Sequence, residues 1–384
     1  MYSDLTSYYY RWYHSRPVLI TPQRRDELRR LHSILVKCCH HFVADWERWL
    51  PLGERETAIL QEQARHPLRL GTWRPDYLAA ADGSLRLCEI TSRFFGHGIF
   101  MSWFGHEWAQ GFLKDFPGAQ CDDSYPALLD KMLSLAAGRP RMYVFKSADP
   151  TSEIRLYRRF YESHDVDFFL LDAEDVERRR PEWDLPECTL ISALNQMDIM
   201  AMDDSTLQAM MERGMISDMR NIFLVHDKRF MQLWFDDAFT GECLTAEETA
   251  FLRAHSIPTY ALADCLEDAL AHKDNFIIKP FRLGKSEGVH AGVMTSKALW
   301  TSLLRKPEGY IIQPFIPQRT FPAVWEGTPF RDYLCGMMLC VDDEYFDSGF
   351  FRFSSLPVTN VGDDRKAAMI HSASGELIPY CDVL

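Results

Sequence analysis

The sequence predicts a mixed α/β protein with helices first, a small parallel sheet in the middle and antiparallel strands at the end. Three observations predict this order: an apolar stripe of helical spacing near the N-terminus, strand-like runs that alternate with a helical stretch, and successive strand-like runs joined by turn residues. With 384 residues, 47% of them hydrophobic, the chain can bury a large core, and its length suggests two or three domains.

The first predicted domain, residues 1–136, combines helices with a hairpin. From Pro22 to about Leu60, apolar residues recur every three to four positions, which predicts a helical opening segment. Between residues 74 and 100 the pattern changes to strand, turn and strand, with Asp82 and Gly83 as the turn residues. This part therefore ends in a hairpin followed by a glycine-bearing loop.

The second predicted domain, residues 137–224, is a small α/β unit. Its strands are the short apolar runs Arg141 to Lys146, Asp167 to Leu171 and Thr189 to Ala193. The stretch from Ser152 to Ser163 between the first two has helical spacing. Strands that alternate with helices are typical of a parallel sheet with crossover connections.

The third predicted domain, residues 225–384, is dominated by antiparallel strands. The strand-like runs are NFIIKPF, GVHAGVM, GYIIQPFI, DYLCGMMLCV and YFDSGFFRFSS, and Gly, Pro and Asp turns join them.

Bulk properties exclude several classes of function. A net charge of -13 opposes binding to a phosphate backbone, and the longest apolar stretches are far shorter than the roughly 20 residues of a membrane helix. The N-terminus lacks the pattern of a signal peptide, and the ten cysteines contain no CxxC pair. We therefore expect a soluble, cytoplasmic protein with reduced thiols and with neither nucleic acid nor membrane as a partner. The sequence leaves open whether the chain forms a homodimer.

The segment Asn275 to Val293 carries the strongest chemical signal. An apolar strand ends in Lys279, and a basic turn with Gly284 and Gly288 leads into a second strand. A lysine fixed on a strand can neutralise phosphate charge, and glycines let backbone amides close over phosphate oxygens. The segment predicts a site for nucleotide phosphates.

Two other interpretations of this segment remain open. GKSEG fits the G-x-S-x-G nucleophile elbow of hydrolases, but that motif needs a helix after the serine, and VHAGV instead alternates like a return strand. An ordinary surface hairpin would show the same letters.

Downstream, GYIIQPFIP reads as an apolar strand that breaks at Gln313 and Pro314. Backbone groups of a chain that stops pairing could bond the edge of an adenine. A glycine-rich hairpin, a short helical stretch, then a strand and hinge form the expected order of elements in a nucleotide site.

The runs IIKPFRLGKSEGV, YIIQPFIP, RDYLCGMMLCV and YFDSGFFRFSS resemble the ATP-grasp superfamily, whose adenine lies between two antiparallel sheets. Such enzymes usually end with a strand of metal carboxylates, which is missing after Arg352. Instead, RPDYLAAADGSLRLCEITSRFFGHGIF resembles the R-x-D followed by E-I-N-T-I-S-x-S-F-G-G of eukaryotic-type glutathione synthetases. The order, with metal strands first and nucleotide loop last, is similar to their circularly permuted ATP-grasp fold.

The resemblance assigns roles to individual residues. Glu89 would be a magnesium ligand, with Asp76 as a carboxylate that orients or binds the metal. Arg74 would face the substrate, and Arg352, in GFFRFS, would meet the phosphate or the substrate. The remaining substrate candidates are Ser92, Arg93, His97 and Asn360. The nucleotide candidates are Lys228, Lys279, Gly284, Lys285, Ser286, Gly288, Gln313, Phe315 and Ile316.

The match departs from the family at two positions. Thr91 stands where the family has a metal-binding Asn, and Leu283 stands where it has a carboxylate. Glu287 or Asp332 could supply the missing oxygen, since magnesium keeps several waters and needs few protein carboxylates.

Two further motifs have both a functional and a structural interpretation. HDKR, with Lys228, resembles the x-D-K-R that opens the nucleotide domain in several ATP-grasp enzymes, whereas the structural interpretation is a helix start capped by Asp227. His97, His106 and Glu107 suggest zinc, but their spacing is not that of a zinc motif.

These residues together predict an ATP- and magnesium-dependent ligase that activates a small carboxylate, such as an amino acid or peptide, as an acyl-phosphate and joins it to an amine. Its setting would be small-peptide or specialised-metabolite biosynthesis. Two alternatives remain: a phosphotransferase that uses the same nucleotide site, and a degenerate ATP-grasp protein that binds nucleotide without turnover.

Overall fold

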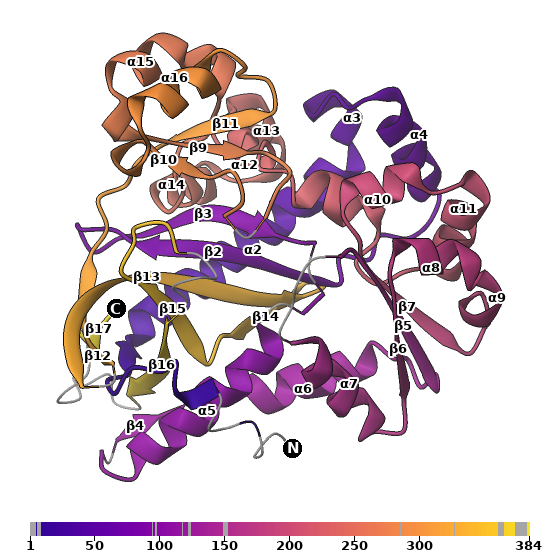
Figure 1. The fold of residues 1–384 in the computed structure, drawn as a ribbon, viewed down its shortest axis with the longest axis horizontal. Helices are drawn as coiled ribbons and strands as arrows, with labels where there is room; N and C mark the ends of the chain where they lie inside the picture. The colour runs from indigo at the N-terminus through magenta and orange to yellow at the C-terminus, as the bar shows by residue number, and fades with distance from the viewer. Residues whose placement is uncertain are drawn as a thin grey trace.

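The computed structural model shows the chain as sheets with helices packed around them (Figure 1). Among the residues it describes, the sheets have ten, four and three strands. The mixed α/β fold with antiparallel and parallel sheets is therefore confirmed. The structure describes residues 5, 9–93, 95–96, 98–116, 118–121, 124–148, 153–284, 286–325, 327–359, 365–372 and 382–384.

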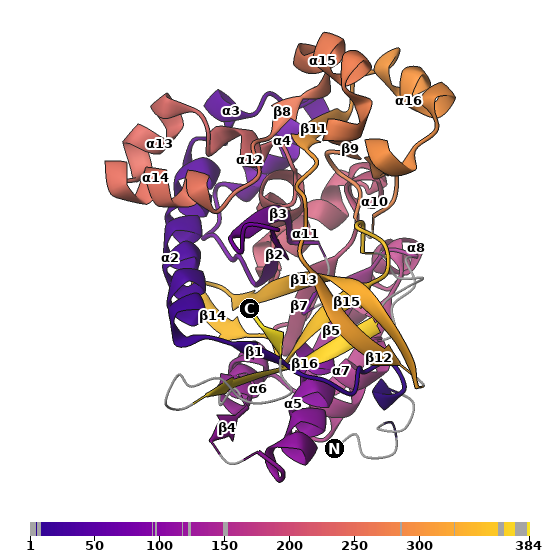
Figure 2. The same ribbon diagram turned by 90° about the vertical axis from the view of Figure 1, so that its left-hand side faces the viewer.

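The opening helices are α2 (Pro22–Ala44), α3 (Trp46–Trp49) and α4 (Glu54–Gln63). The predicted helical opening segment from Pro22 to about Leu60 is confirmed, and it is divided into these three helices. Helix α2 stops at Asp45, whose φ of -135° is not helical, and Pro51 ahead of α4 has no amide hydrogen to continue a helix. As the spacing of its apolar residues predicts, α2 buries one face against the core beside the large sheet (Figure 2).

The largest sheet joins strands from both ends of the chain in the order β17-β1-β16-β15-β13-β2-β3. Off this path, β12 (Thr320–Trp325) and β14 (Glu344–Asp347) pair with β13, and β4 (Ala119–Gln120) pairs with β16. The main strands are β1 (Val18–Ile20), β2 (Thr72–Ala79), β3 (Leu85–Thr91), β13 (Thr328–Val341), β15 (Phe350–Ser354), β16 (Arg365–Ser372) and β17 (Asp382–Val383).

The pairing register of this sheet brings distant residues together. Asp76 lies opposite Glu89 on β3 and opposite Met337 on β13, and Cys335 on β13 lies opposite Arg352 on β15. Residues directly opposite each other in an antiparallel pair project from the same face. The predicted metal hairpin and the predicted arginine strand therefore share one face of one sheet.

The small parallel sheet has the order β6-β5-β7 (Figure 1). Its predicted strands and helix are confirmed to within two residues, with β5 at Arg141–Lys146, α7 at Ile154–Glu162, β6 at Asp167–Leu171 and β7 at Cys188–Ala193. The domain boundaries at residues 136 and 224 stay a prediction.

The four-stranded sheet, order β10-β9-β11-β8, forms a lobe with its own small core of Leu262, Ile278, Trp300 and Ile312. The lobe contains β8 (Tyr260–Ala261), α15 (Leu266–Ala271), β9 (Phe276–Pro280), β10 (His290–Ala291), α16 (Lys297–Leu304) and β11 (Tyr310–Pro314).

The predicted return strand in this lobe is shorter than expected. Strand β10 covers His290 and Ala291, and the chain then makes a 3-10 turn from Gly292 to Met294. Gly292 packs directly on the backbone of Lys273, because an added Cβ would lie 1.8 Å from that carbonyl oxygen. The close approach bends the chain away from the ladder.

The remaining helices cover the sheets. None of the helices in the described part of the chain is long and apolar enough to cross a membrane. Their bounds are α5 (Ile99–Leu113), α6 (Ser124–Ser134), α8 (Ala173–Arg178), α9 (Arg180–Trp183), α10 (Gln196–Ala201), α11 (Asp204–Arg213), the π-helical turn Asn221–Val225, α12 (Phe230–Leu233), α13 (Asp237–Cys243) and α14 (Ala246–Ala254).

Candidate active site

Two buried lysines reach the hairpin formed by β2 and β3. Lys279 Nζ donates a hydrogen bond to the carbonyl oxygen of Cys88 at 3.1 Å, across 191 positions of sequence. Lys228 Nζ lies 3.7 Å from Glu89 Oε2. The early acidic hairpin and the late lysine-bearing hairpin therefore converge on one place.

Strand geometry explains the direction of Lys279. Ile278 belongs to the core of the lobe, and successive side chains of a strand point to opposite faces. Lys279 therefore leaves the face that looks away from that core. Its neighbour across the ladder is Ile311 on β11, which places the same face of both strands toward the hairpin.

Glu89 lies at the centre of a cationic cluster. Its side chain is 23% exposed, and burial alone would raise its pKa. Lys228, Lys279, Arg352 and Arg74 outweigh burial, and the pKa of Glu89 is lowered from its ordinary value. The carboxylate is therefore ionised at neutral pH and can serve as a ligand for a cation.

Asp76 holds two arginines in place. Its Oδ1 accepts from Arg74 Nε at 2.7 Å, and its Oδ2 accepts from Nη2 of Arg74 at 2.8 Å and of Arg352 at 2.7 Å. Arg352 Nη2 also donates to Cys335 Sγ at 3.1 Å. Both oxygens of Asp76 thus accept hydrogen bonds from arginine, which favours an orienting role over direct metal binding.

The loop after β9 is tied to its surroundings on several sides. Lys228 Nζ donates to the carbonyl oxygen of Leu283 at 2.5 Å, and Arg282 pairs with Glu56 at 2.5 Å. Ser286 Oγ donates to the carbonyl oxygen of Thr359 at 3.0 Å. The loop therefore bridges from Lys228 to the segment that follows β15.

The nucleophile-elbow interpretation of this loop is wrong. Ser286 has a positive φ of 60° and is followed by a turn and then by strand β10, not by a helix. Gly288 needs its φ of 67° because Pro280 leaves no room for a side chain there. Gly284 accepts from the amide of Glu287, and Lys285 lies outside the described residues.

His226 is a site residue to which the sequence assigned no role. Its Nδ1 accepts from the amide of Ser92 at 3.4 Å, and its ring is buried. Burial, Lys228 and Arg93 lower the pKa of His226 well below its ordinary value, so the imidazole is neutral. No local motif could have identified it, because its partner Ser92 lies 134 positions away.

Arg93 is buried and lies near His226. Burial lowers its pKa, while Asp198 on α10 and Glu287 of the loop after β9 oppose that shift. The predicted substrate residues Ser92 and Arg93 therefore lie next to the lysine cluster. His97 and Asn360, the other two substrate candidates, lie outside the described residues.

The predicted hinge after β11 differs from expectation. The chain does not stop pairing at Gln313, since the ladder with β9 continues to Pro314 and the amide of Phe315 donates to the carbonyl oxygen of Asn275 at 2.7 Å. The side chain of Gln313 is buried, and its Nε2 donates to Thr259 Oγ1 at 2.8 Å. Within the described chain, its Oε1 has no hydrogen-bond partner.

Asp332 does not supply the missing metal oxygen. It is fully buried and accepts from Arg365 Nη2 at 2.7 Å and Nε at 2.8 Å, with His14 Nε2 at 3.3 Å. Over the described residues, no group of three or more His, Cys, Asp or Glu side chains could hold a metal. A magnesium ion here would depend on Glu89, water and the nucleotide.

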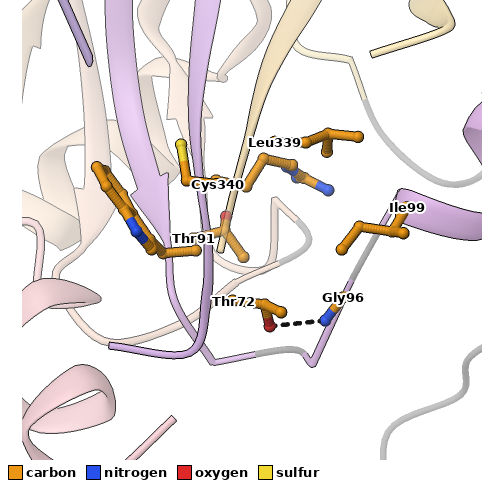
Figure 3. A pocket seen from close by; sticks show the side chains of 8 residues that line it. Thr72, Thr91, Gly96, Ile99, Leu339 and Cys340 are labelled. Carbon is orange, nitrogen blue, oxygen red and sulfur yellow. Dashed lines mark hydrogen bonds between the residues drawn. The ribbon is translucent and has the colours of Figure 1, made fainter. Parts of the chain in front are cut away.

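A small cavity of about 10 Å³ is lined by residues of β2, β3, β13 and the start of α5, among them Arg74, Thr91 and Ile99 (Figure 3). Across it, the amide of Gly96 donates to Thr72 Oγ1 at 2.8 Å. Such a space holds about one water molecule. The cavity is therefore too small for a substrate.

Glu153 fixes the loop that leads from β3 into α5. It accepts from the amides of Gly98 at 2.8 Å and Met101 at 3.0 Å. Burial raises its pKa to about 7, against the opposing effects of these amides, Arg74 and Lys366. The sequence assigned no role to Glu153, because nothing local connects it with the helix that it caps.

This raised pKa predicts a pH dependence of stability. Between pH 4.5 and 7 the folded state keeps a proton that the unfolded state loses, so this group's contribution to stability falls as pH rises through that window. Glu153→Gln should remove that fall, and its stability relative to wild type should increase by up to about 3 kcal/mol from pH 4.5 to 8. Thermal unfolding of both proteins across this range tests it, and a pH-independent difference would contradict it.

Large parts of this sequence match known proteins. The family model described as "AnkG N-terminal domain" matches residues 30–224. The "ATP-grasp enzyme ankG" of Aspergillus thermomutatus is 24% identical over 389 residues, which cover 84% of this chain and 78% of that protein.

Two solved structures match most of this chain, one of them with a TM-score above 0.5. The apo form of a glutathione synthetase-like effector from Globodera pallida has a TM-score of 0.55 at 9% identity, over 93% of this chain and 89% of that chain. A putative gamma-glutamylcysteine synthetase from Methylobacillus flagellatus KT has a TM-score of 0.42 at 10% identity, over 88% of each chain.

Proposed function

The chain belongs to the family described as the AnkG N-terminal domain and has the glutathione synthetase-like ATP-grasp fold, and on this premise we propose that it is an ATP- and magnesium-dependent carboxylate-amine ligase. It would activate a small carboxylate, an amino acid or peptide, as an acyl-phosphate and join it to an amine. Small-peptide or specialised-metabolite biosynthesis is the setting that we propose, with small molecules as the partners.

One observation carries this proposal: Glu89 is surrounded by four cations from four separate segments of the chain, Lys228 in the turn before α12, Lys279 on β9, Arg352 on β15 and Arg74 on β2. The excess of cations fits a triphosphate, and a single ionised carboxylate fits magnesium, which keeps waters and phosphate oxygens as its other ligands. The Oε1 of Gln313, which has no hydrogen-bond partner among the described residues, fits the amino group of a base.

ATP, when bound with magnesium, would supply the phosphoryl group that makes a carboxylate reactive. The residues of the chain would mainly position the reacting groups and neutralise the negative charge of the phosphates. Lys228 and Lys279 would hold phosphate oxygens, and Arg352 and Arg74, fixed by Asp76, would hold the substrate carboxylate. An arginine can donate two parallel hydrogen bonds to a carboxylate, whereas a lysine offers a single point charge.

The remaining neighbours would shape the acceptor side. Arg93 and the amide of Ser92 lie beside the neutral ring of His226. An uncharged imidazole adds no further positive charge to the cluster. It would therefore order the loop after β3 without repelling the ammonium form of an incoming amine.

The proposal is tested by measuring the ADP and phosphate that are released from ATP in the presence of a panel of amino acids and amines. The ligase requires both a carboxylate and an amine for steady release of ADP together with free phosphate. A phosphotransferase would release ADP without free phosphate and without an amine. Binding of ATP with no ADP above background for any pair would favour the degenerate binding protein.

Asp76→Asn should lower turnover by about 10- to 100-fold, because the two arginines lose the charged acceptor that orients them. ADP release measures the effect. Asp343→Asn, at an exposed carboxylate paired with His40, is the matched control and should keep full activity. Equal activity of the two variants would refute the orienting role of Asp76.

A further inference from the structure

One buried carboxylate of the opening helical segment reaches the loop that follows β9. Glu56 lies in the first turn of α4 and is 4% exposed. Glutamate is almost never fully buried unless it is paired. Here Oε1 of Glu56 lies 2.5 Å from Nη1 of Arg282, which stands in the loop between β9 and β10. An ion pair therefore joins the opening helices to the loop that begins after Lys279.

The two oxygens of Glu56 have different tasks. Oε2 accepts from the amide of Gly53 at 3.0 Å and so caps the start of α4, whereas Oε1 faces Arg282. The amide oxygen of a glutamine could accept from Gly53 equally well, so the start of the helix does not require a charge. The charge of Glu56 therefore serves its contact with the loop.

Helix α4 is anchored independently of this ion pair. Ile59 and Leu60 are buried in the main core, and Arg55 Nη2 donates to the carbonyl oxygen of Met202 at 2.9 Å. A buried ion pair adds little net stability, because the cost of removing two charges from water offsets most of their attraction. The ion pair of Glu56 is therefore mainly positional, with α4 as a fixed support.

A second buried carboxylate holds Arg282 from another direction. Asp227 is 1% exposed, and its Oδ2 lies 3.6 Å from Arg282 Nε. Asp227 also accepts from Nε of Arg229 at 3.0 Å and from its Nη2 at 2.7 Å. The guanidinium carbon of Arg229 lies 4.1 Å from the ring centroid of Phe281, and that of Arg282 lies 5.6 Å from it. Arg282 is thus held by Glu56, Asp227 and the ring beside it.

The residues on either side of Arg282 contact a proposed phosphate ligand. The carbonyl oxygen of Phe281 accepts from the amide of Lys228 at 2.9 Å, and that of Leu283 accepts from Lys228 Nζ at 2.5 Å. Lys228 Nζ also lies 3.7 Å from Glu89 Oε2. A shift of Arg282 would therefore move the carbonyl oxygen that orients the ammonium of Lys228.

We propose that Glu56 is a positioning residue for the nucleotide, because through Arg282 it holds the loop after β9 in the arrangement that receives the phosphates. This role rests on the proposed function, since it concerns the same ATP site. Without the ion pair the loop samples other arrangements, and the nucleotide must restore the competent one when it binds. The opening helical segment, to which the sequence assigned no function, thereby contributes to nucleotide affinity.

The test compares Glu56→Gln with wild type. Glutamine keeps the size of the side chain and an acceptor for Gly53 but removes the charge that faces Arg282. In a calorimetric titration of the full chain, the Kd of a non-hydrolysable ATP analogue with magnesium should rise about 5- to 20-fold. In turnover, the KM for ATP should rise by a similar factor, while kcat at saturating ATP should stay within about two-fold of wild type.

A double-mutant cycle assigns the effect to the ion pair. Arg282→Met leaves the sequence of α4 unchanged and should also weaken binding of the analogue. Glu56→Gln should weaken it no further in that background, because the partner is already absent. Glu54→Gln, at an exposed glutamate in the same turn of α4, is the matched control and should bind like wild type.

Three results would overturn this role of Glu56 and leave the proposed function intact. They are an unchanged Kd in Glu56→Gln, additive effects of the two substitutions, and a loss of kcat with unchanged KM, which indicates a smaller folded fraction. If wild type itself bound no nucleotide, the proposed function would fail, and the role of Glu56 would fail with it.

Discussion

Lys279→Met should lower the rate of ADP release by about 10²- to 10³-fold with the fold intact. Lys279 is 6% exposed, lies on β9 and acts electrostatically on Glu89, so its ammonium is placed to stabilise phosphate charge as it develops. Methionine keeps the length and apolar stem of the side chain but removes the charge. Steady-state ADP release at saturating ATP, carboxylate and amine measures the effect.

The matched control is Lys297→Met, at an exposed lysine on α16 of the same lobe, which should keep wild-type activity. Thermal unfolding of both variants should stay close to wild type. If Lys279→Met turned over at a rate within a few-fold of Lys297→Met, the lysine would have no role in phosphate transfer.

Glu89→Gln should lower ADP release by at least about 10²-fold, because the amide cannot replace a carboxylate as a magnesium ligand and several kcal/mol of charge stabilisation are lost. The same change leaves Lys228, Lys279 and the two arginines without their shared anion. Raising the magnesium concentration should restore part of the activity if the carboxylate holds the metal. Measuring the activity of Glu89→Gln and wild type as a function of magnesium concentration tests this metal role.

The pH dependence of the free energy of unfolding tests the charge of Glu89 independently of activity. The folded state lowers its pKa below 4.5, so the charged form stabilises the fold at neutral pH, and this contribution is lost as pH falls below 4.5. Glu89→Gln should therefore be less stable than wild type at pH 7 and should approach it in acid. Glu308→Gln, at an exposed glutamate of the lobe, should follow wild type throughout. Full activity of Glu89→Gln at low magnesium would contradict the metal role.

The different environments of the two lysines explain why Lys279 is the more informative position. Lys228 donates to the carbonyl oxygen of Leu283, and its pKa is lowered chiefly by burial, against the attraction of Glu89. Its removal would disturb the loop after β9 as well as the charge. Lys279 bonds only one carbonyl oxygen among the contacts that the structure gives, so its substitution isolates the charge more cleanly.

Local pattern was sufficient for most of the elements. The strands Arg141–Lys146 and Asp167–Leu171 have the bounds that their apolar runs predict, and the β2–β3 turn lies at Asp82 and Gly83. These features depend on side-chain period and turn chemistry, which neighbouring residues determine. Where prediction failed, a distant contact decided the outcome: Gly292 turns on the backbone of Lys273, and Phe315 stays bonded to Asn275.

The sequence by itself determined the fold class, the hairpin of Arg74, Asp76 and Glu89, and the lysine at the end of β9, because each depends on residues within a few positions of one another. Only the tertiary structure decided that Asp76 orients two arginines, that neutral His226 lies beside Ser92, and that Asp332 is occupied by Arg365. Those relations join segments up to 276 positions apart. The packing of the sheets determines the burial and the charged neighbours of each carboxylate, and so which oxygens remain available to bind a metal or a substrate. No local sequence pattern contains this information.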